Sequence, residues 1–210
     1  MSEETYKGYT IRIETDSYPL NPRTEWDNLG IMACSHRRYD MGDKEHIVNF
    51  KNHKGWDSVT AWLLKNRAVA VLPIYMYDHS GQTINTTGFN SIDSPRWDWG
   101  QLGVIYTAME KLHEVGHTWK KMNSQRRAKV KEWLLDEVRI YDHYLTGEVY
   151  VFTIVNQDDE EEYSCGGFYG SDHKASGLLE SAREVINSNI EYRLKFEGIQ
   201  EELPLETLTT

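Results

Sequence analysis

The chain has 210 residues, of which 39% are hydrophobic, so it can bury a core and does not have the composition of a disordered chain. Its formal net charge of −10 argues against general nucleic-acid binding, which requires a basic surface for phosphates, and permits basic proteins or small molecules as partners. The sequence contains no run of about 18 apolar residues, which argues against a membrane span.

The N-terminus and the cysteines indicate a compartment. Residues 1–10 lack the charged and then apolar pattern of a signal peptide. The two cysteines, Cys34 and Cys165, are too few for a disulfide framework or a cysteine-based zinc site. We therefore expect a protein of a reducing cytoplasm.

The first half of the chain alternates strands with loops. Tyr9, Ile11 and Ile13 alternate with polar residues, which predicts a half-buried strand. Asp57 or Ser58 is expected to cap a helix. The elements expected in this half are a strand at 9–13, a loop at 16–23, a strand at 29–36, a turn at 37–43, a helix to about residue 67, a strand at 69–76 and a returning strand at 83–89.

The second half is richer in helix. Thr107 and Glu110 have the spacing of a capping box, which predicts a helix that stops at Gly116. The other elements expected are a strand end at 103–106, a helix at 124–145, an antiparallel hairpin of 148–156 with 162–169, and a helix at 175–196. This order predicts one α+β domain over residues 1–197, with a mostly antiparallel sheet, about three main helices and an acidic flexible tail at 198–210.

One apolar strand ends abruptly in the polar residues Asp78, His79, Ser80 and Gly81. A carboxylate, an imidazole and a hydroxyl at a strand end could perform chemistry. The same residues also suit a turn, because Asp and Ser hydrogen-bond to their own backbone and Gly accepts a positive φ. The turn is the favoured interpretation.

A catalytic cleft is the chemical alternative. Cys34 and His36 are two residues apart and share a face of a strand, so the imidazole could activate the thiol. Arg37 and Arg38 could lower the pKa of that thiol. The opposite interpretation is a small buried cysteine beside a histidine at a strand end. The candidate catalytic residues are Cys34, His36, Asp78, His79 and Asp98.

Metal binding has weaker support in the sequence. His36, His79 and one of Asp27, Asp78 or Asp98 could hold a metal ion, yet the chain has no HExxH motif. We therefore assign no metal ligand. The cofactor, if any, is unknown.

Three loops at predicted strand ends combine aromatic and polar residues, which is the composition of recognition sites. We expect them to gather on one side of the sheet, with Trp97 or Trp99 exposed. Alternatively, each Trp is buried separately and each Asp-Gly pair only makes a turn. The candidate binding residues are Trp26, Asp27, Asn28, Tyr77, Ser80, Trp97, Trp99 and Gln101.

Charge is distributed unevenly. The run from Lys120 to Lys131 holds six positive charges and no acid, which is either a solvated face or a local contact for an anion or nucleic acid. Residues 158–162 and 197–206 are acidic and could mimic a phosphate backbone, although basic residues are mixed through the chain.

Six segments rich in Trp, Asp, Gly, His and Tyr together resemble a family of uncharacterised proteins carried mainly by bacteriophages and mobile elements. The chain departs from the family pattern at Asp93–Arg96, where a cysteine is usual, and at Gly166, where a Trp is usual. The segments are Trp26–Gly30, Cys34–Tyr39, Tyr77–Gly81, Trp97–Gln101, Tyr141–Gly147 and Ser164–Gly170.

The resemblance implies a phage or mobile-element accessory protein that acts in the cytoplasm of a bacterial host. We expect it to bind a host protein and to inhibit a bacterial defence system. The alternative is a small hydrolase or metal-dependent enzyme that uses the Cys/His/Asp cleft, so enzymatic activity is left open. The sequence leaves the partner and the oligomeric state unidentified.

Overall fold

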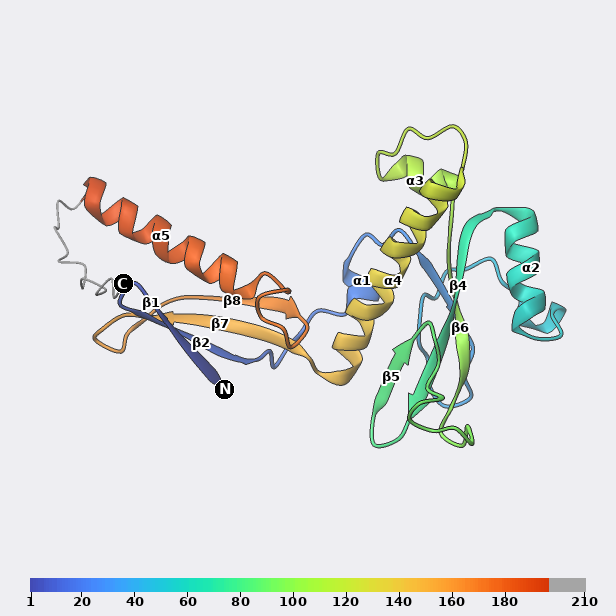
Figure 1. Ribbon diagram of the computed structural model, residues 1–210, viewed down its shortest axis with the longest axis horizontal. Coiled ribbons are helices and arrows are strands. Elements are labelled where there is room, and N and C mark those ends of the chain that lie inside the picture. Colours follow the sequence, from blue (N-terminus) through green and yellow to red (C-terminus); the bar gives the residue numbers. More distant parts are fainter. Residues whose placement is uncertain (197–210) are drawn as a thin grey trace, which may run out of the picture. The chain divides into compact units, whose positions relative to one another are not determined.

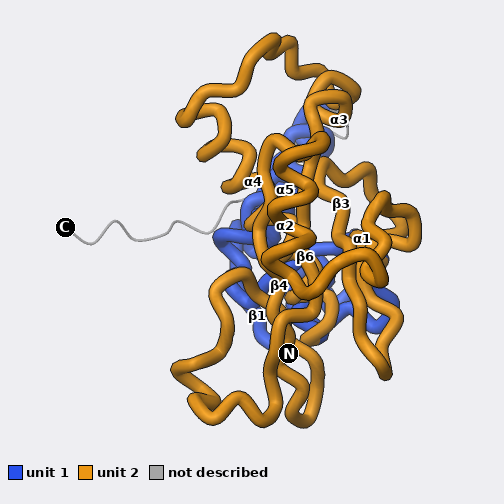
Figure 2. The backbone as a smooth tube through the Cα atoms, turned by 90° about the vertical axis from the view of Figure 1, so that its right-hand side faces the viewer, with its two compact units in different colours: residues 1–20, 147–210 blue, residues 21–146 orange. Residues whose placement is uncertain are grey.

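The computed structural model describes residues 1–196, and the tail predicted at 198–210 lies outside these residues. Contacts within the chain divide it into two compact units (Figure 2). Unit 1 contains residues 1–20 and the chain from residue 147 onward, and unit 2 contains residues 21–146. Each unit has its own sheet and core. That residues 1–197 act as one domain therefore stays a prediction, to be tested by unfolding.

Unit 1 is a four-stranded antiparallel sheet with one long helix on its surface (Figure 1). The sheet has the order β1-β2-β7-β8, and the alternation predicted at Tyr9, Ile11 and Ile13 is confirmed because all three are buried under the helix. The strand β1 was not predicted. The elements are β1 (Ser2–Tyr6), β2 (Tyr9–Thr15), β7 (Val149–Val155), β8 (Glu161–Tyr169) and α5 (Leu178–Phe196).

Unit 2 is a second four-stranded antiparallel sheet, in the order β3-β6-β4-β5, with a helix on each face (Figure 1). The helix α4 covers one face around Leu134, and α2 covers the other around Leu63. The elements are α1 (Pro22–Glu25), β3 (Ile31–Cys34), the 3₁₀ helix η1 (Phe50–Asn52), α2 (Trp56–Asn66), β4 (Ala68–Asp78), β5 (Gln82–Asn85), β6 (Trp99–Ala108), α3 (Met109–Glu114) and α4 (Ser124–Thr146).

The predicted α+β class is confirmed. Every strand pair of both sheets is antiparallel, and the two predicted hairpins, β4 with β5 and β7 with β8, are present. Three helices in the described residues, α2, α4 and α5, have more than seven residues. No helix within residues 1–196 combines the length and apolarity needed to cross a bilayer.

Two predicted helix starts are wrong. The residue that caps α2 is Gly55, ahead of Asp57 and Ser58, and it makes no side-chain capping bond. Thr107 belongs to β6, and α3 begins two residues later at Met109 without a side-chain cap. The strand extends through Thr107 because Thr107 pairs with Ala70 of β4 and its side chain is completely buried.

The strand directions determine where the loops of unit 2 meet. Both β3 and β4 run antiparallel to β6 and lie on either side of it. The last residues of β3 and β4 and the first residues of β6 therefore lie at the same end of the sheet. The segments after Cys34, around Asp78 and before Trp99 are brought together by this arrangement.

Candidate functional site

A polar pocket of about 280 Å³ lies at this end of the sheet in unit 2. We call it the Trp97 pocket. Its walls come from the segment after β3, from the end of β4 and from the start of β6. Six residues of the predicted site, His36, Asp78, Trp97, Asp98, Trp99 and Gln101, line the pocket. The other lining residues are Arg37, Arg38, Met76, Gly100 and Leu102.

Asp78 is the centre of a hydrogen-bonded group in the pocket wall. Its carboxylate pairs with the Arg38 guanidinium and accepts hydrogen bonds from the Tyr39 hydroxyl (3.1 Å) and from Gln82 Nε2 (3.4 Å). Burial by itself raises the pKa of Asp78, but the bonds from Gln82 and Tyr39 and the charges of Arg38 and His36 outweigh it, so the pKa is lowered. Asp78 therefore stays ionised and held in place.

His36 is positioned by its neighbours in sequence. Its ring stacks on Tyr39, with centroids 5.1 Å apart and planes 7° from parallel. Its Nδ1 accepts a hydrogen bond from the backbone N–H of Arg38 at 3.3 Å.

The end of β4, with Asp78 and His79, was expected either to make a turn or to carry chemically active side chains, and it does both. Ser80 and Gly81 have positive φ values of 58° and 153° and make the turn between β4 and β5. The preceding side chains belong to the pocket region: Asp78 lines it, and His79 Nδ1 lies 3.1 Å from Oδ2 of the pocket residue Asp98. The turn interpretation thus describes Ser80 and Gly81, while Asp78 and His79 carry the chemical groups.

The two Trp residues before and at the start of β6 have different environments. The Trp97 side chain is 86% exposed at the edge of the pocket, whereas Trp99 is only 8% exposed. The Trp99 indole donates to the carbonyl of Asp93 (2.6 Å) and its ring contacts Tyr75 and Phe89. Trp99 therefore supports the loop, and Trp97 is the aromatic group presented to solvent.

The surroundings of Cys34 favour the alternative interpretation, a cysteine packed at a strand end, over an activated nucleophile. Burial raises the pKa of its thiol to about 12, with a further increase from the charge of Asp43. The thiol packs against the backbone of Gly42, where a Cβ would lie only 2.8 Å from Sγ. Arg37 and Arg38 were expected to activate the thiol, but Arg38 pairs with Asp78 instead. A half-buried, protonated thiol that packs against the core is a poor nucleophile.

The third predicted loop, Trp26 to Asn28, lies at a different cavity of unit 2, with a volume of about 480 Å³. The physical reason is the direction of β3: this loop precedes β3, so it shares an end of the sheet with the last residues of β6, including Ala108. Asn28 donates to the carbonyls of Pro22 and Trp26, which closes the loop. The expected gathering of three loops is thus limited to two.

A buried ion network supports this second end of the sheet. Arg23, whose side chain is 2% exposed, pairs with Asp43 at 2.6 Å and with Glu137 at 2.9 Å. The carboxylate of Glu137 also accepts the backbone N–H groups of Leu29 and Gly30. Since every charged group is paired, this network holds α1, the loop before β3 and α4 together.

The remaining predicted residues have mainly local contacts. Tyr77 stacks on His79 with centroids 5.9 Å apart, and Gln101 Nε2 donates to the carbonyl of Gly103 at 3.1 Å. Within residues 1–196, no group of three His, Cys, Asp or Glu side chains is placed to hold one metal ion. The metal set proposed from His36, His79 and an aspartate is therefore not assembled there.

Arg38, which lines the pocket, and Tyr39 beside it were absent from the predicted set. Arg38 pairs with Asp78, and Tyr39 both donates to Asp78 and stacks on His36. A signal was present in the sequence, because both directly follow His36 within the segment from Cys34 to Tyr39.

In comparisons with known proteins, no family model matched this chain, and no curated protein or solved structure was significantly similar to it.

Proposed function

We propose that this protein is a binding protein of phage or mobile-element origin, and that the Trp97 pocket recognises a segment of a bacterial host protein. The observation that carries the proposal is the combination of a solvent-exposed Trp97 with a polar pocket beside it. Large aromatic side chains at the edge of a pocket are frequent anchors of protein interfaces.

The pocket walls support binding because their polar groups are already oriented. Arg38, Tyr39 and Gln82 hold Asp78, and His79 contacts Asp98. Groups positioned before binding lose less conformational entropy when the partner arrives. The walls offer both guanidinium donors and carboxylate acceptors, which suits a polar peptide segment.

The proposal of a host partner rests on the family resemblance of the six aromatic and polar segments. A phage protein that acts in the cytoplasm of the host gains from binding a component of a defence system. Three of these segments, Cys34–Tyr39, Tyr77–Gly81 and Trp97–Gln101, contribute residues to the pocket region.

The test is a quantitative pull-down from host lysate. Wild-type protein, Trp97→Ala and the matched control Tyr18→Ala serve as baits, because Tyr18 is a 90% exposed aromatic residue of unit 1. We expect one host protein at near-stoichiometric amount with wild type and Tyr18→Ala, and its loss with Trp97→Ala. Recovery of no such protein, or equal recovery with all three baits, would contradict the proposal.

A hydrolytic function is the second candidate, and the His79–Asp98 contact at 3.1 Å favours it. Asp98 would orient the imidazole, and His79 would accept a proton from water as the water oxygen attacks an ester carbonyl. The tetrahedral intermediate would then break its bond to the leaving oxygen, and that oxygen would take the proton from His79. With a chromogenic acetate ester, His79→Ala should lower turnover by about 10²-fold or more. His113→Ala is the matched control, because His113 is also an exposed histidine. Turnover equal to buffer, or equal in both variants, would exclude this function for the pair.

A further inference from the structure

A second surface of unit 2 combines basic and aromatic side chains. It is formed by the segment 115–123, which joins α3 to α4, and by the first turns of α4 up to Trp133. We call it the basic aromatic surface. Its six cations stand in contrast to the net charge of −10 of the whole chain.

Three nearly parallel aromatic rings form the centre of this surface. The His117 ring lies 4.8 Å from Trp119 and 4.7 Å from Trp133, between centroids, and the two Trp rings are 6.0 Å apart with planes only 13° from parallel. Trp119 and Trp133 are half-buried and pack on the core under α4. The core packing holds the rings as a rigid platform.

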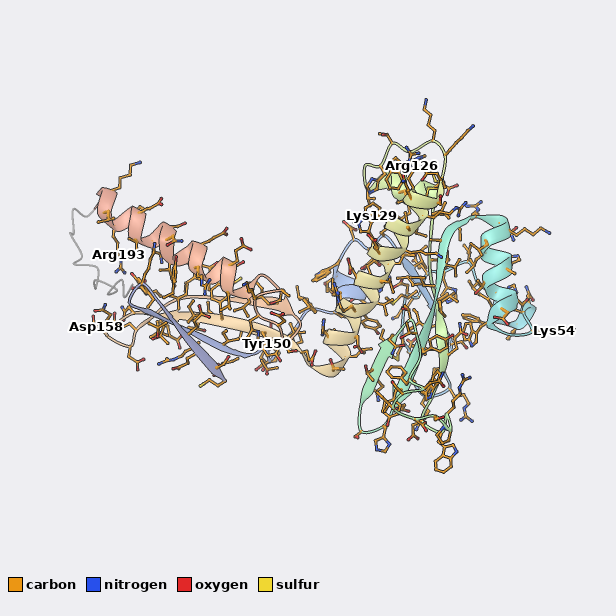
Figure 3. The ribbon with its side chains drawn as sticks, viewed as in Figure 1. Lys54, Arg126, Lys129, Tyr150, Asp158 and Arg193 are labelled. Atoms are coloured by element: carbon orange, nitrogen blue, oxygen red, sulfur yellow. The ribbon has the colours of Figure 1, made fainter. Side chains whose placement is uncertain are left out.

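Two cations lie over the two Trp rings. The Arg126 guanidinium is 5.2 Å from the centroid of Trp119, and the Lys129 ammonium is 5.9 Å from that of Trp133. The labelled side chains of Arg126 and Lys129 both extend from the beginning of α4 (Figure 3). Bases stack on guanidinium planes as they do on aromatic rings, so Arg126 extends the platform.

Three of the six charges have no structural explanation in the fold, whereas Arg127 donates to the Val69 carbonyl and Lys129 pairs with Glu132. Lys120, Lys121 and Lys131 are exposed, and the described residues provide no ion-pair partner for them. Cations around a helix N-terminus also oppose the helix dipole, so they do not stabilise α4. A concentration of charge that does not stabilise the fold is available for an anionic ligand.

We propose that the basic aromatic surface binds single-stranded nucleic acid, with bases on the Trp119–Arg126 platform and phosphates on Lys120, Lys121 and Lys131. Single strands are favoured over duplex because only unpaired bases reach a stacking platform. They are favoured over an acidic protein segment because carboxylates alone make no use of three aligned rings. The overall negative charge of the protein restricts binding to this surface and keeps it modest in affinity.

The test is fluorescence anisotropy of the full chain with a labelled oligothymidine of about 15 nucleotides. We expect binding that weakens by about 20- to 50-fold between about 50 and 200 mM salt, as three or four phosphate contacts require. An abasic strand of the same length, a duplex and polyglutamate should each bind more weakly. Equal affinity for any of these three, or no binding to oligothymidine at low salt, would overturn the proposal.

Variants locate the site. Lys120→Glu with Lys121→Glu should weaken binding by more than about tenfold and flatten the slope of log affinity against log salt by about 1.4, two contacts being lost. Lys51→Glu with Lys54→Glu, at exposed positions before α2, makes the same charge change and should leave most of the affinity. An equal loss in the two double variants, with unchanged circular dichroism, would show that only net charge matters and would contradict the site.

Discussion

At the scale of single residues, Cys34 shows how position overrides chemical type. A cysteine two residues from a histidine suggests a nucleophile, but the direction in which β3 presents the side chain decides the outcome. The thiol faces the core and Gly42, and burial raises its pKa to about 12. Spacing along a strand predicts which residues share a face; it does not reveal which face is covered.

The raised pKa of Cys34 predicts a pH dependence of stability. The thiol ionises near pH 9 in the unfolded chain, while in the folded protein it stays protonated up to about pH 12. The contribution of Cys34 to the free energy of unfolding is therefore complete below pH 9 and is lost as the pH rises toward 12. The difference in unfolding free energy between wild type and Cys34→Ala should fall by about 1.4 kcal/mol between about pH 8 and pH 10. Denaturant titrations at the two pH values measure it.

The same residue provides an independent check. In a Cys165→Ser background, iodoacetamide should modify Cys34 in the folded protein much more slowly than in the unfolded chain at neutral pH. Modification at the rate of a free cysteine would mean that the thiol is accessible or ionised, and the description of Cys34 as a protonated thiol packed against the core would be wrong.

At the scale of elements, periodicity predicted what depends on local sequence. The alternation of β2, the two hairpins and the long helix α4 follow from the spacing of apolar residues and from turn residues such as Gly81. The helix starts were wrong at Asp57 and Thr107. At Thr107 the pairing of β6 with β4 and the burial of the side chain outweigh a capping preference.

The burial of Thr107 in β6 should reduce the stability of the protein, and this can be tested. Its hydroxyl is buried in β6 with no hydrogen-bond partner in the structure. Thr107→Val should therefore leave the free energy of unfolding unchanged or raise it by about 1 kcal/mol, because a buried unpaired polar atom is removed. Chemical denaturation of the purified variant measures this change.

Thr83 is the matched control, since its hydroxyl donates to Asp142 at 2.7 Å. Thr83→Val should lose about 1 kcal/mol of stability. If Thr107→Val is instead the more damaging substitution, then the Thr107 hydroxyl has a partner, and the description of β6 at this position fails.

The order and direction of the strands also determine how the candidate site is assembled. The segments that contain Asp78 and Trp97 lie at strand ends, as predicted, but the order and direction of the strands decide which ends meet. The pairing of β3 with β6 joins segments about 70 residues apart, and no local pattern reveals such a pairing. The Arg23 network with Asp43 and Glu137 was missed for the same reason.

At the scale of the whole molecule, the division into two units predicts separate responses to damage in the two cores. Phe152 is fully buried in the core of unit 1. Phe152→Ala should lower the stability of that core by about 3–5 kcal/mol. Hydrogen exchange should accelerate in β2 and β7 while the amides of β4 and β6 keep their protection.

The opposite outcome has a clear meaning. If exchange accelerates equally in β6 and β7, the two units unfold as one cooperative domain, as the sequence predicted for residues 1–197. Protection that is unchanged in both units would contradict the assignment of Phe152 to the core of unit 1.

The most direct measurement of the central claim is site-specific photo-crosslinking in the bacterial host, with a benzophenone amino acid at position 97 or, as the control, at position 18. Both positions are exposed aromatic residues, but only Trp97 borders the pocket. We predict one discrete crosslinked host protein from position 97, which disappears when Asp98 is also changed to Ala, and none from position 18. The absence of any crosslink from position 97, or the same products from both positions, would contradict binding at the Trp97 pocket.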